Sequence, residues 1–186
     1  MPNRAIFLDR DGTINEDPGY ISNPDDVVLI PKAAEALSLL KKNSYKLIVI
    51  SNQSGIARGI MSRDDVVNVN ARINKLLNKK NVKIDAFYFC HAHPDFSTKE
   101  ECKCRKPSPK LVYEAAKDFN VEMRESFFIG DAVSDIECGK NAGLRTILVR
   151  TGKGMESLSI LQKENNFPSF VADNLFNACK YILPDN

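Results

Sequence analysis

The sequence lacks three features that would place it in a more specialised class of protein. Lys and Arg total 26 and Asp and Glu total 24, giving a net charge of +2. The chain therefore lacks the clustered basic excess that a general nucleic-acid surface needs. It has no apolar run of membrane-spanning length, and residues 1–4 lead into a strand without the apolar region of a signal peptide. We expect a cytoplasmic protein that binds neither nucleic acid nor membranes.

No internal repeat or low-complexity tract interrupts the chain, and its size limits its organisation. A length of 186 residues with 43% hydrophobic content is enough for one good core and leaves little for a second domain. We expect residues 1–186 to form a single domain, and a monomer. Five cysteines are present, and in an intracellular chain they indicate thiols or metal ligands rather than disulfides.

The most informative stretch is IFLDRDGT at residues 6–13, where an apolar run ends abruptly in charge. A run such as 5–8 suits a buried parallel strand, which is covered on both faces. Asp9 and Asp11 then fall beyond the carboxyl end of the strand, where open α/β sheets bind their ligands. An ordinary strand followed by an Asp-Gly turn has the same pattern, so motifs elsewhere must decide between the two interpretations.

Strand-like and helix-like segments alternate along the chain. This alternation predicts βαβ units, a parallel sheet and hence a three-layer Rossmann-like α/β fold. Residues 14–26 form a polar loop that we expect to close over a ligand, and residues 150–172 form a polar linker. The expected strands are 5–8, 46–50, 84–89, 126–129 and 146–149; the expected helices are 31–42, 62–79, 109–120, 134–141 and 173–182.

Polar residues follow the first, second and fourth expected strands. In a parallel sheet they project from one edge, so Asp9, Asp11, Ser51, Asn52 and Asp131 should converge. Three carboxylates in one crevice repel each other unless a cation lies between them or their pKa values rise strongly. A hard divalent ion such as Mg²⁺ suits oxygen ligands and an anionic substrate. The sequence therefore predicts a magnesium site at this edge.

The same residues carry a family resemblance. DRDGT, Ser51-Asn52, Lys106 and Gly130-Asp131 with Asp135 resemble, in order, the four motifs of haloacid-dehalogenase (HAD) type phosphatases. FLDRDGTIN, SNQSGIARG, CKCRKP and Gly19-Tyr20 are similar to heptose bisphosphate phosphatases of lipopolysaccharide core and surface-glycan synthesis. The resemblance implies a HAD-like fold with a minimal cap and a phosphoric monoester hydrolase that removes the phosphate on carbon seven of a heptose 1,7-bisphosphate.

The resemblance also implies catalytic roles. Asp9 would attack phosphorus and form an aspartyl-phosphate, and Asp11 would act as general acid and then base. Mg²⁺ would be held by Asp9, the backbone carbonyl of Asp11, and Asp131, with Asp135 in support. Lys106 would add positive charge.

Substrate contacts are implied in three segments. A lysine that commonly follows the metal-binding aspartate in the heptose phosphatases is replaced by Ala132. Arg105 would bind the second phosphate, although it could also be a solvated loop cation. The expected substrate-binding residues are Asp17, Gly19, Tyr20, Ser51, Asn52, Gln53, Ser54, Arg105 and Lys106.

The segment 90–106 contains three cysteines and both histidines of the chain. Cys90, Cys102 and Cys104 with one histidine match the ligand types of a structural zinc site. The heptose phosphatases bind such a zinc ion, and two of their ligands have a Cys-x-His spacing. Position 92 is alanine here, so the fourth ligand is His93 or His91, and we favour His93 because three-residue spacing lets both side chains reach one ion. Metal-free thiols are the alternative.

Two alternative functions remain open on the sequence. Histidinol-phosphate phosphatases are near neighbours of the heptose enzymes, although the segment from Asp17 to Tyr20 argues against that substrate. A catalytically retired, zinc-stapled domain that binds phosphorylated sugars is the other alternative. Retirement predicts loss of Asp9, Asp11 or Lys106, and all three are present.

Overall fold

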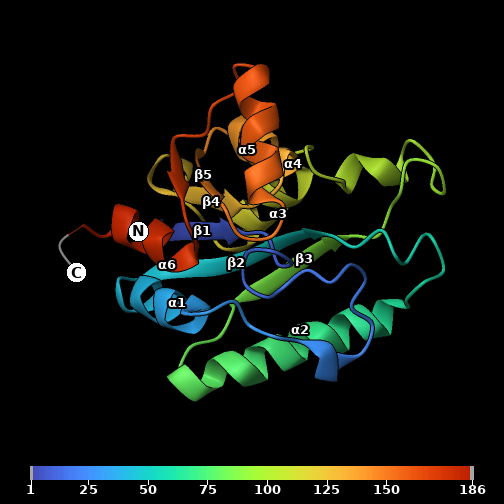
Figure 1. The fold of residues 1–186 in the computed structure, drawn as a ribbon, viewed down its shortest axis with the longest axis horizontal. Coiled ribbons are helices and arrows are strands. Elements are labelled where there is room, and N and C mark those ends of the chain that lie inside the picture. The colour runs from blue at the N-terminus through green and yellow to red at the C-terminus, as the bar shows by residue number, and fades with distance from the viewer. Residues whose placement is uncertain (1, 185–186) are drawn as a thin grey trace.

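The computed structural model describes residues 2–184, which form one sheet flanked by helices (Figure 1). The sheet has six strands in the order β3-β2-β1-β4-β5-β6, and all neighbouring strands are parallel. This confirms the predicted α/β fold with a parallel sheet. The strands are β1 (Arg4–Leu8), β2 (Tyr45–Asn52), β3 (Ala86–Cys90), β4 (Phe127–Gly130), β5 (Arg145–Val149) and β6 (Phe170–Ala172).

Helices cover both faces of the sheet and make three layers. Side chains alternate along β1: Ile6 and Leu8 pack in one core cluster with α1, α2 and α6, whereas Phe7 packs in another with α3 and α4. In Figure 1, α1 and α2 lie below the sheet and α3, α4 and α5 above it. The helices are α1 (Ala33–Lys42), α2 (Arg63–Leu77), α3 (Lys110–Asp118), α4 (Val133–Asn141), α5 (Gly154–Lys163) and α6 (Leu175–Ile182).

Two elements differ from the sequence-based expectation. Residues 150–172 contain α5 and the edge strand β6, not only a polar linker. The strand is three residues long, too short to show an alternating pattern. Helix α5 buries only Gly154, Ser157 and Leu161, so its buried face is poor in large apolar residues and its periodicity is weak. None of the helices in the described part of the chain could span a bilayer.

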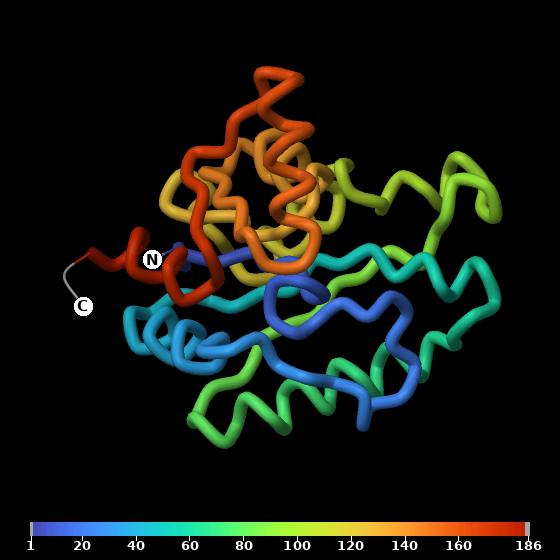
Figure 2. Tube along the Cα trace, in the orientation of Figure 1, coloured from blue at the N-terminus to red at the C-terminus, as the bar shows by residue number. Residues whose placement is uncertain are grey.

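Loops extend from the carboxyl ends of β1, β2 and β3 at one edge of the sheet (Figure 2). They meet around Arg58, whose Nη1 donates to the Tyr20 hydroxyl at 2.9 Å. The same guanidinium lies 5.8 Å from the ring centroid of Phe96. The first loop carries one short 3-10 helix, Pro24–Asp26. These three loops build one wall of the candidate site.

Candidate active site

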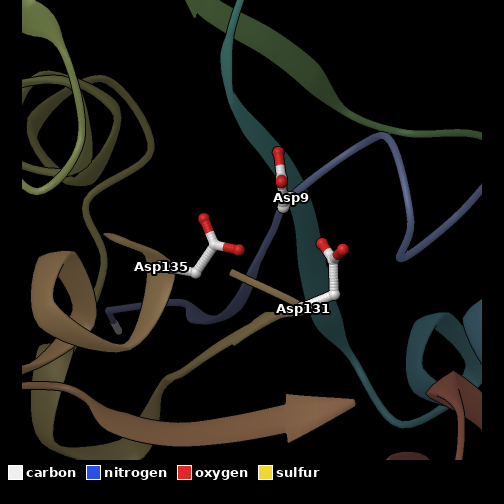
Figure 3. A group of neighbouring side chains, drawn as sticks. All are labelled: Asp9, Asp131 and Asp135. Carbon is white, nitrogen blue, oxygen red and sulfur yellow. The ribbon is translucent and has the colours of Figure 1, made fainter. Parts of the chain in front are cut away.

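Three carboxylates meet where the strand order reverses, between β1 and β4 (Figure 3). Asp9 follows β1, Asp131 follows β4, and Asp135 lies in the first turn of α4. Each offers an oxygen within 4.8 Å of the others, and residues 2–184 contain no second group of three or more His, Cys, Asp or Glu ligands this close. We call these residues the carboxylate cluster. A reversal of strand order is the usual ligand crevice of an open α/β sheet.

Lys106 supplies the positive charge that faces the carboxylate cluster. Its Nζ lies 2.8 Å from Asp9 Oδ1 and 2.6 Å from Asp135 Oδ1, and donates to the Ile50 carbonyl at 2.8 Å. Asn52 clamps its backbone, because Asn52 Oδ1 accepts from Lys106 N–H at 3.0 Å and Nδ2 donates to Lys106 O at 3.3 Å. Both the ammonium group and the backbone of Lys106 are thus held in place.

The pKa values in the cluster reflect this crowding. Burial of the Lys106 ammonium alone would lower its pKa, but the carboxylates of Asp135 and Asp9 outweigh burial and raise it. Burial, followed by the charge of Asp135, raises the pKa of Asp9 well above 3.8. The same two causes raise the pKa of Asp131 to about 7. Three carboxylates against one ammonium leave an excess of negative charge that a divalent cation would balance.

Glycines allow the chain to approach the Asp131 carboxylate closely. Gly12 has φ +78° and Gly152 has φ +55°, and a Cβ on either would overlap Asp131. The carboxylate then accepts hydrogen bonds from Lys153 N–H at 2.8 Å and from the Thr13 hydroxyl at 3.4 Å. The loops after β1 and β5 thereby orient a group that follows β4.

We expect Asp131→Asn to change how stability depends on pH in metal-free protein. The Asp131 carboxyl stabilises the fold below its unfolded pKa near 3.8, and this contribution is lost as pH rises through about 7. The variant should be more stable than the parent by up to about 4 kcal/mol at pH 8 and by less than about 2 kcal/mol at pH 5. Urea unfolding in chelator at both pH values measures the difference. The exposed control Asp26→Asn should show none, and a pH-independent difference for Asp131→Asn would contradict the prediction.

Asp11 lies beside the cluster and is tightly held. Its carboxylate forms an ion pair with Arg10 at 2.8 Å and accepts hydrogen bonds from Asn15 Nδ2 at 2.8 Å and Gln53 Nε2 at 3.0 Å. Its side chain is 18% exposed. Asp11 therefore reaches the cavity with its orientation set by neighbours.

A cavity of about 340 Å³ opens in front of these groups. All but one of the residues expected to bind substrate line it; the exception is Ser51, which is buried within β2. Asp17, Gly19, Tyr20, Asn52, Gln53, Ser54, Arg105 and Lys106 are in the lining together with Asp9, Asp11 and Asp131. Hydrogen bonds from Ser54 and Arg58 lower the pKa of Tyr20 despite its partial burial.

Three lining residues were not predicted: Ala132, Ser134 and Lys153. Lys153 follows β5, and its Nζ lies 3.4 Å from Asp17 Oδ2. Polar residues after β5 lie at the same edge of the sheet as those after the other parallel strands, so the sequence did hold a signal for Lys153. Lys153 offers a cation to the cavity, whereas Ala132 offers none.

The cysteine loop differs from the expectation of free thiols or zinc ligands. Cys90 and Cys104 form a disulfide with Cα atoms 5.4 Å apart, and Cys102 is a free thiol. The Nδ1 atom of His93 accepts a hydrogen bond from Asp95 N–H at 3.1 Å. In the disulfide, Cys90 and Cys104 are not thiolates, which is the form of cysteine that binds zinc.

The sequence of this chain is similar to those of known phosphatases. A HAD-hydrolase-like family model matches residues 103–178. The D-glycero-D-manno-heptose-1,7-bisphosphate 7-phosphatase of Chlorobaculum tepidum is 44% identical over 97% of this chain and 94% of its own length. The chain belongs to the heptose-1,7-bisphosphate 7-phosphatase family. Another member of this family, from Vibrio cholerae serotype O1, is 35% identical over 98% of both chains.

Solved structures of the heptose-1,7-bisphosphate phosphatases share the fold. The crystal structure of the enzyme from B. bronchiseptica, complexed with magnesium and phosphate, has a TM-score of 0.88 and 26% identity over 98% of this chain and 99% of that chain. The enzyme from Burkholderia thailandensis gives a TM-score of 0.72 and 27% identity over 97% and 99% of the two chains. The predicted family, the HAD-like fold and phosphatase chemistry are confirmed.

Proposed function

We propose that this phosphatase removes the carbon-seven phosphate of D-glycero-D-manno-heptose 1,7-bisphosphate, in the synthesis of ADP- or GDP-heptose for lipopolysaccharide core or surface glycans. The observation that carries the proposal is the pairing of Asp9 with Lys106 and Asp131 at the sheet edge. This pairing occurs in a chain 44% identical to a protein named for that activity.

The chemistry would proceed in two steps at phosphorus. A carboxylate oxygen of Asp9 attacks, the bond from phosphorus to the sugar oxygen breaks, and Asp11 protonates the departing oxygen. Asp11 then takes a proton from a water that attacks the aspartyl-phosphate, which regenerates Asp9 and releases inorganic phosphate. Lys106, 2.8 Å from Asp9 Oδ1, holds the nucleophile in place and stabilises negative charge that develops on the phosphoryl oxygens.

The excess negative charge of the cluster supports a Mg²⁺ cofactor. The Asp9 and Asp131 carboxylates and the Asp11 backbone carbonyl would hold the ion. It would neutralise the phosphoryl oxygens during transfer. Asp135 is engaged otherwise, since its carboxylate binds Lys106 and accepts from Ala132 N–H at 2.9 Å, which suits a supporting role.

Cations farther out in the cavity would bind the second phosphate and the sugar. Arg105 is anchored by donating to the Ala92 carbonyl at 3.1 Å, so it presents a fixed charge at one side of the cavity. Lys153 presents a more exposed one, since its side chain is 67% exposed. Asp17, Gly19, Tyr20 and Ser54 would contact sugar hydroxyls.

We expect Lys153→Ala to raise the KM for heptose bisphosphate about tenfold and to change kcat little, because it removes one charge-assisted contact away from the reacting phosphorus. Steady-state kinetics on the bisphosphate measures this effect. Lys163→Ala, at the exposed end of α5, is the matched control. An unchanged KM for Lys153→Ala, or a fall in kcat alone, would contradict the assignment.

A substrate panel tests the proposed function directly. It compares kcat/KM for both anomers of heptose bisphosphate and for histidinol phosphate. We expect the preferred anomer to exceed histidinol phosphate by roughly 100-fold. A preference for histidinol phosphate would replace the proposed substrate, and release of no phosphate above the Asp9→Asn background would indicate a domain that only binds phosphosugars.

We also propose that the reduced protein binds a structural Zn²⁺ through Cys90, Cys102, Cys104 and either His93 or His91. All three sulfurs and both histidines lie within the segment 90–104, and Cys90 and Cys104 are already adjacent. Protein purified with reductant should contain about one zinc per chain by elemental analysis, and Cys102→Ser should lower it severalfold. The buried-cysteine control Cys179→Ser should retain the parent's content. Zinc-free reduced protein would contradict the proposal.

We propose that the protein works as a cytoplasmic monomer with a small-molecule substrate and without nucleic-acid or membrane partners. Its balanced charge supports this. Light scattering at micromolar concentration should give the mass of one chain, and a dimer mass would contradict the monomer.

A further inference from the structure

The largest fully buried side chain of the described residues is a charged one, Arg10, at 1% exposure. Its guanidinium forms five contacts with three side chains. Nε lies 3.0 and 3.1 Å from the two oxygens of Asp11, and Nη2 lies 2.8 Å from Oδ2. Nη2 also donates to Gln53 Oε1 at 3.0 Å, and Nη1 donates to Asn70 Oδ1 at 3.1 Å. A buried charge with this many partners is held in one position.

Gln53 closes a ring between Arg10 and Asp11. Its carbonyl oxygen accepts from Arg10, while its amide nitrogen donates to Asp11 Oδ2 at 3.0 Å. Both ends of the amide are therefore used, and reversing the amide would put donors face to face with the guanidinium. Gln53 is 4% exposed. Although it lines the cavity, its carbonyl oxygen is directed to Arg10 and its amide nitrogen to Asp11.

Asn70 connects this ring to the helical layer below the sheet. It lies on α2, is 6% exposed and does not line the catalytic cavity. Its acceptor satisfies the guanidinium nitrogen that neither Asp11 nor Gln53 contacts. Without that acceptor, a buried cationic N–H would lack a partner, which favours displacement of Arg10.

We propose that Arg10, Gln53 and Asn70 are positioning residues that set the orientation of the Asp11 carboxylate for proton transfer. The inference rests on the proposed function, in which Asp11 protonates the leaving sugar oxygen. None of the three residues needs to touch the reacting atoms: Asn70 fixes Arg10, and Arg10 with Gln53 fixes Asp11. A general acid must lie within about 3 Å of the atom that it protonates, so a small rotation of Asp11 reduces transfer.

Leaving groups of different basicity distinguish positioning from a structural role. The alkoxide of a sugar phosphate needs a proton to depart, whereas p-nitrophenolate departs readily without one. Asn70→Leu keeps the side-chain size and removes the acceptor. Gln53→Met also keeps the side-chain size, and it removes both the acceptor for Arg10 and the donor to Asp11. Asn68→Leu, on an exposed position of α2, is the matched control.

We expect the ratio of kcat/KM for heptose bisphosphate to that for p-nitrophenyl phosphate to fall about tenfold in Asn70→Leu and in Gln53→Met, which is a partial loss of general acid catalysis. The control should keep the parent's ratio. An unchanged ratio in both variants, or failure of both to fold, would overturn the inference, since either result would make the cluster structural. Hydrolysis of neither ester by the parent chain would overturn the proposed function and the inference with it.

Discussion

Asp9→Asn is expected to lower phosphate release by roughly four orders of magnitude or more, because loss of a covalent nucleophile removes a reaction path and not a single contact. The structure makes this substitution conservative in shape. Asn can still accept from Arg10 N–H, which donates to Asp9 Oδ1 at 2.7 Å. Phosphate release from heptose bisphosphate with saturating Mg²⁺ measures the loss. Asp64→Asn, at the exposed start of α2, should retain full activity.

The same variant should be more stable than the parent when no metal is bound. Burial and the charge of Asp135 raise the pKa of Asp9 well above its ordinary value, so the ionised carboxylate disfavours the folded state at neutral pH. Asparagine removes that penalty, and the melting temperature in chelator should rise. Residual activity above a few per cent would contradict the nucleophile assignment, whereas a lower melting temperature would contradict the electrostatic one.

Lys106→Met is expected to lower both the stability of the fold and the activity, whereas Asp9→Asn lowers only the activity. The methionine fills the volume but leaves Asp9 and Asp135 without the ammonium that lies within 2.8 Å of each. Removing one partner of a buried ion pair typically lowers the free energy of unfolding by about 3 to 5 kcal/mol. Turnover should fall by about a hundredfold to a thousandfold, because the charge that steadies the phosphoryl oxygens is lost.

The loss of stability in Lys106→Met should shrink at low pH. The carboxylates around it take up protons as pH falls, and a neutral carboxyl needs no buried cation. Denaturant unfolding at pH 8 and pH 5 in chelator measures this dependence. Lys110→Met, at the exposed start of α3, is the matched control and should show little loss at either pH. Equal stability of Lys106→Met and the parent at pH 8 would mean that the carboxylates do not depend on this ammonium.

Much of the fold was predictable because most strands and helices are specified by the residues within them. Buried parallel strands such as β1 and β2 are continuous apolar runs, and each run that ends in polar residues marks a position at the sheet edge. The pairing of Asp9 with Asp131 followed from that rule and from chain order. Helix α5 and strand β6 were missed because one buries few large apolar residues and the other is three residues long.

The rest of the site was not predictable because it depends on pairings distant in the sequence. Arg10 and Asn70 are 60 residues apart, and no periodicity links a loop arginine to one asparagine on a helix. The family resemblance implied a substrate contact for Gln53, and the structure shows its side-chain amide hydrogen-bonded to Arg10 and Asp11. The disulfide between Cys90 and Cys104 likewise depends on how the loop folds back, which residue spacing alone does not specify.

The central claim is that Asp9 and Asp131 share one divalent cation at the end of β1 and β4. A crystal structure with Mn²⁺ in place of Mg²⁺ tests this most directly, because anomalous scattering locates the ion independently of the protein model. We predict one anomalous peak within coordination distance of both carboxylates and of the Asp11 carbonyl oxygen. A peak bound by only one of the two aspartates, or no peak between them at saturating Mn²⁺, would contradict the account.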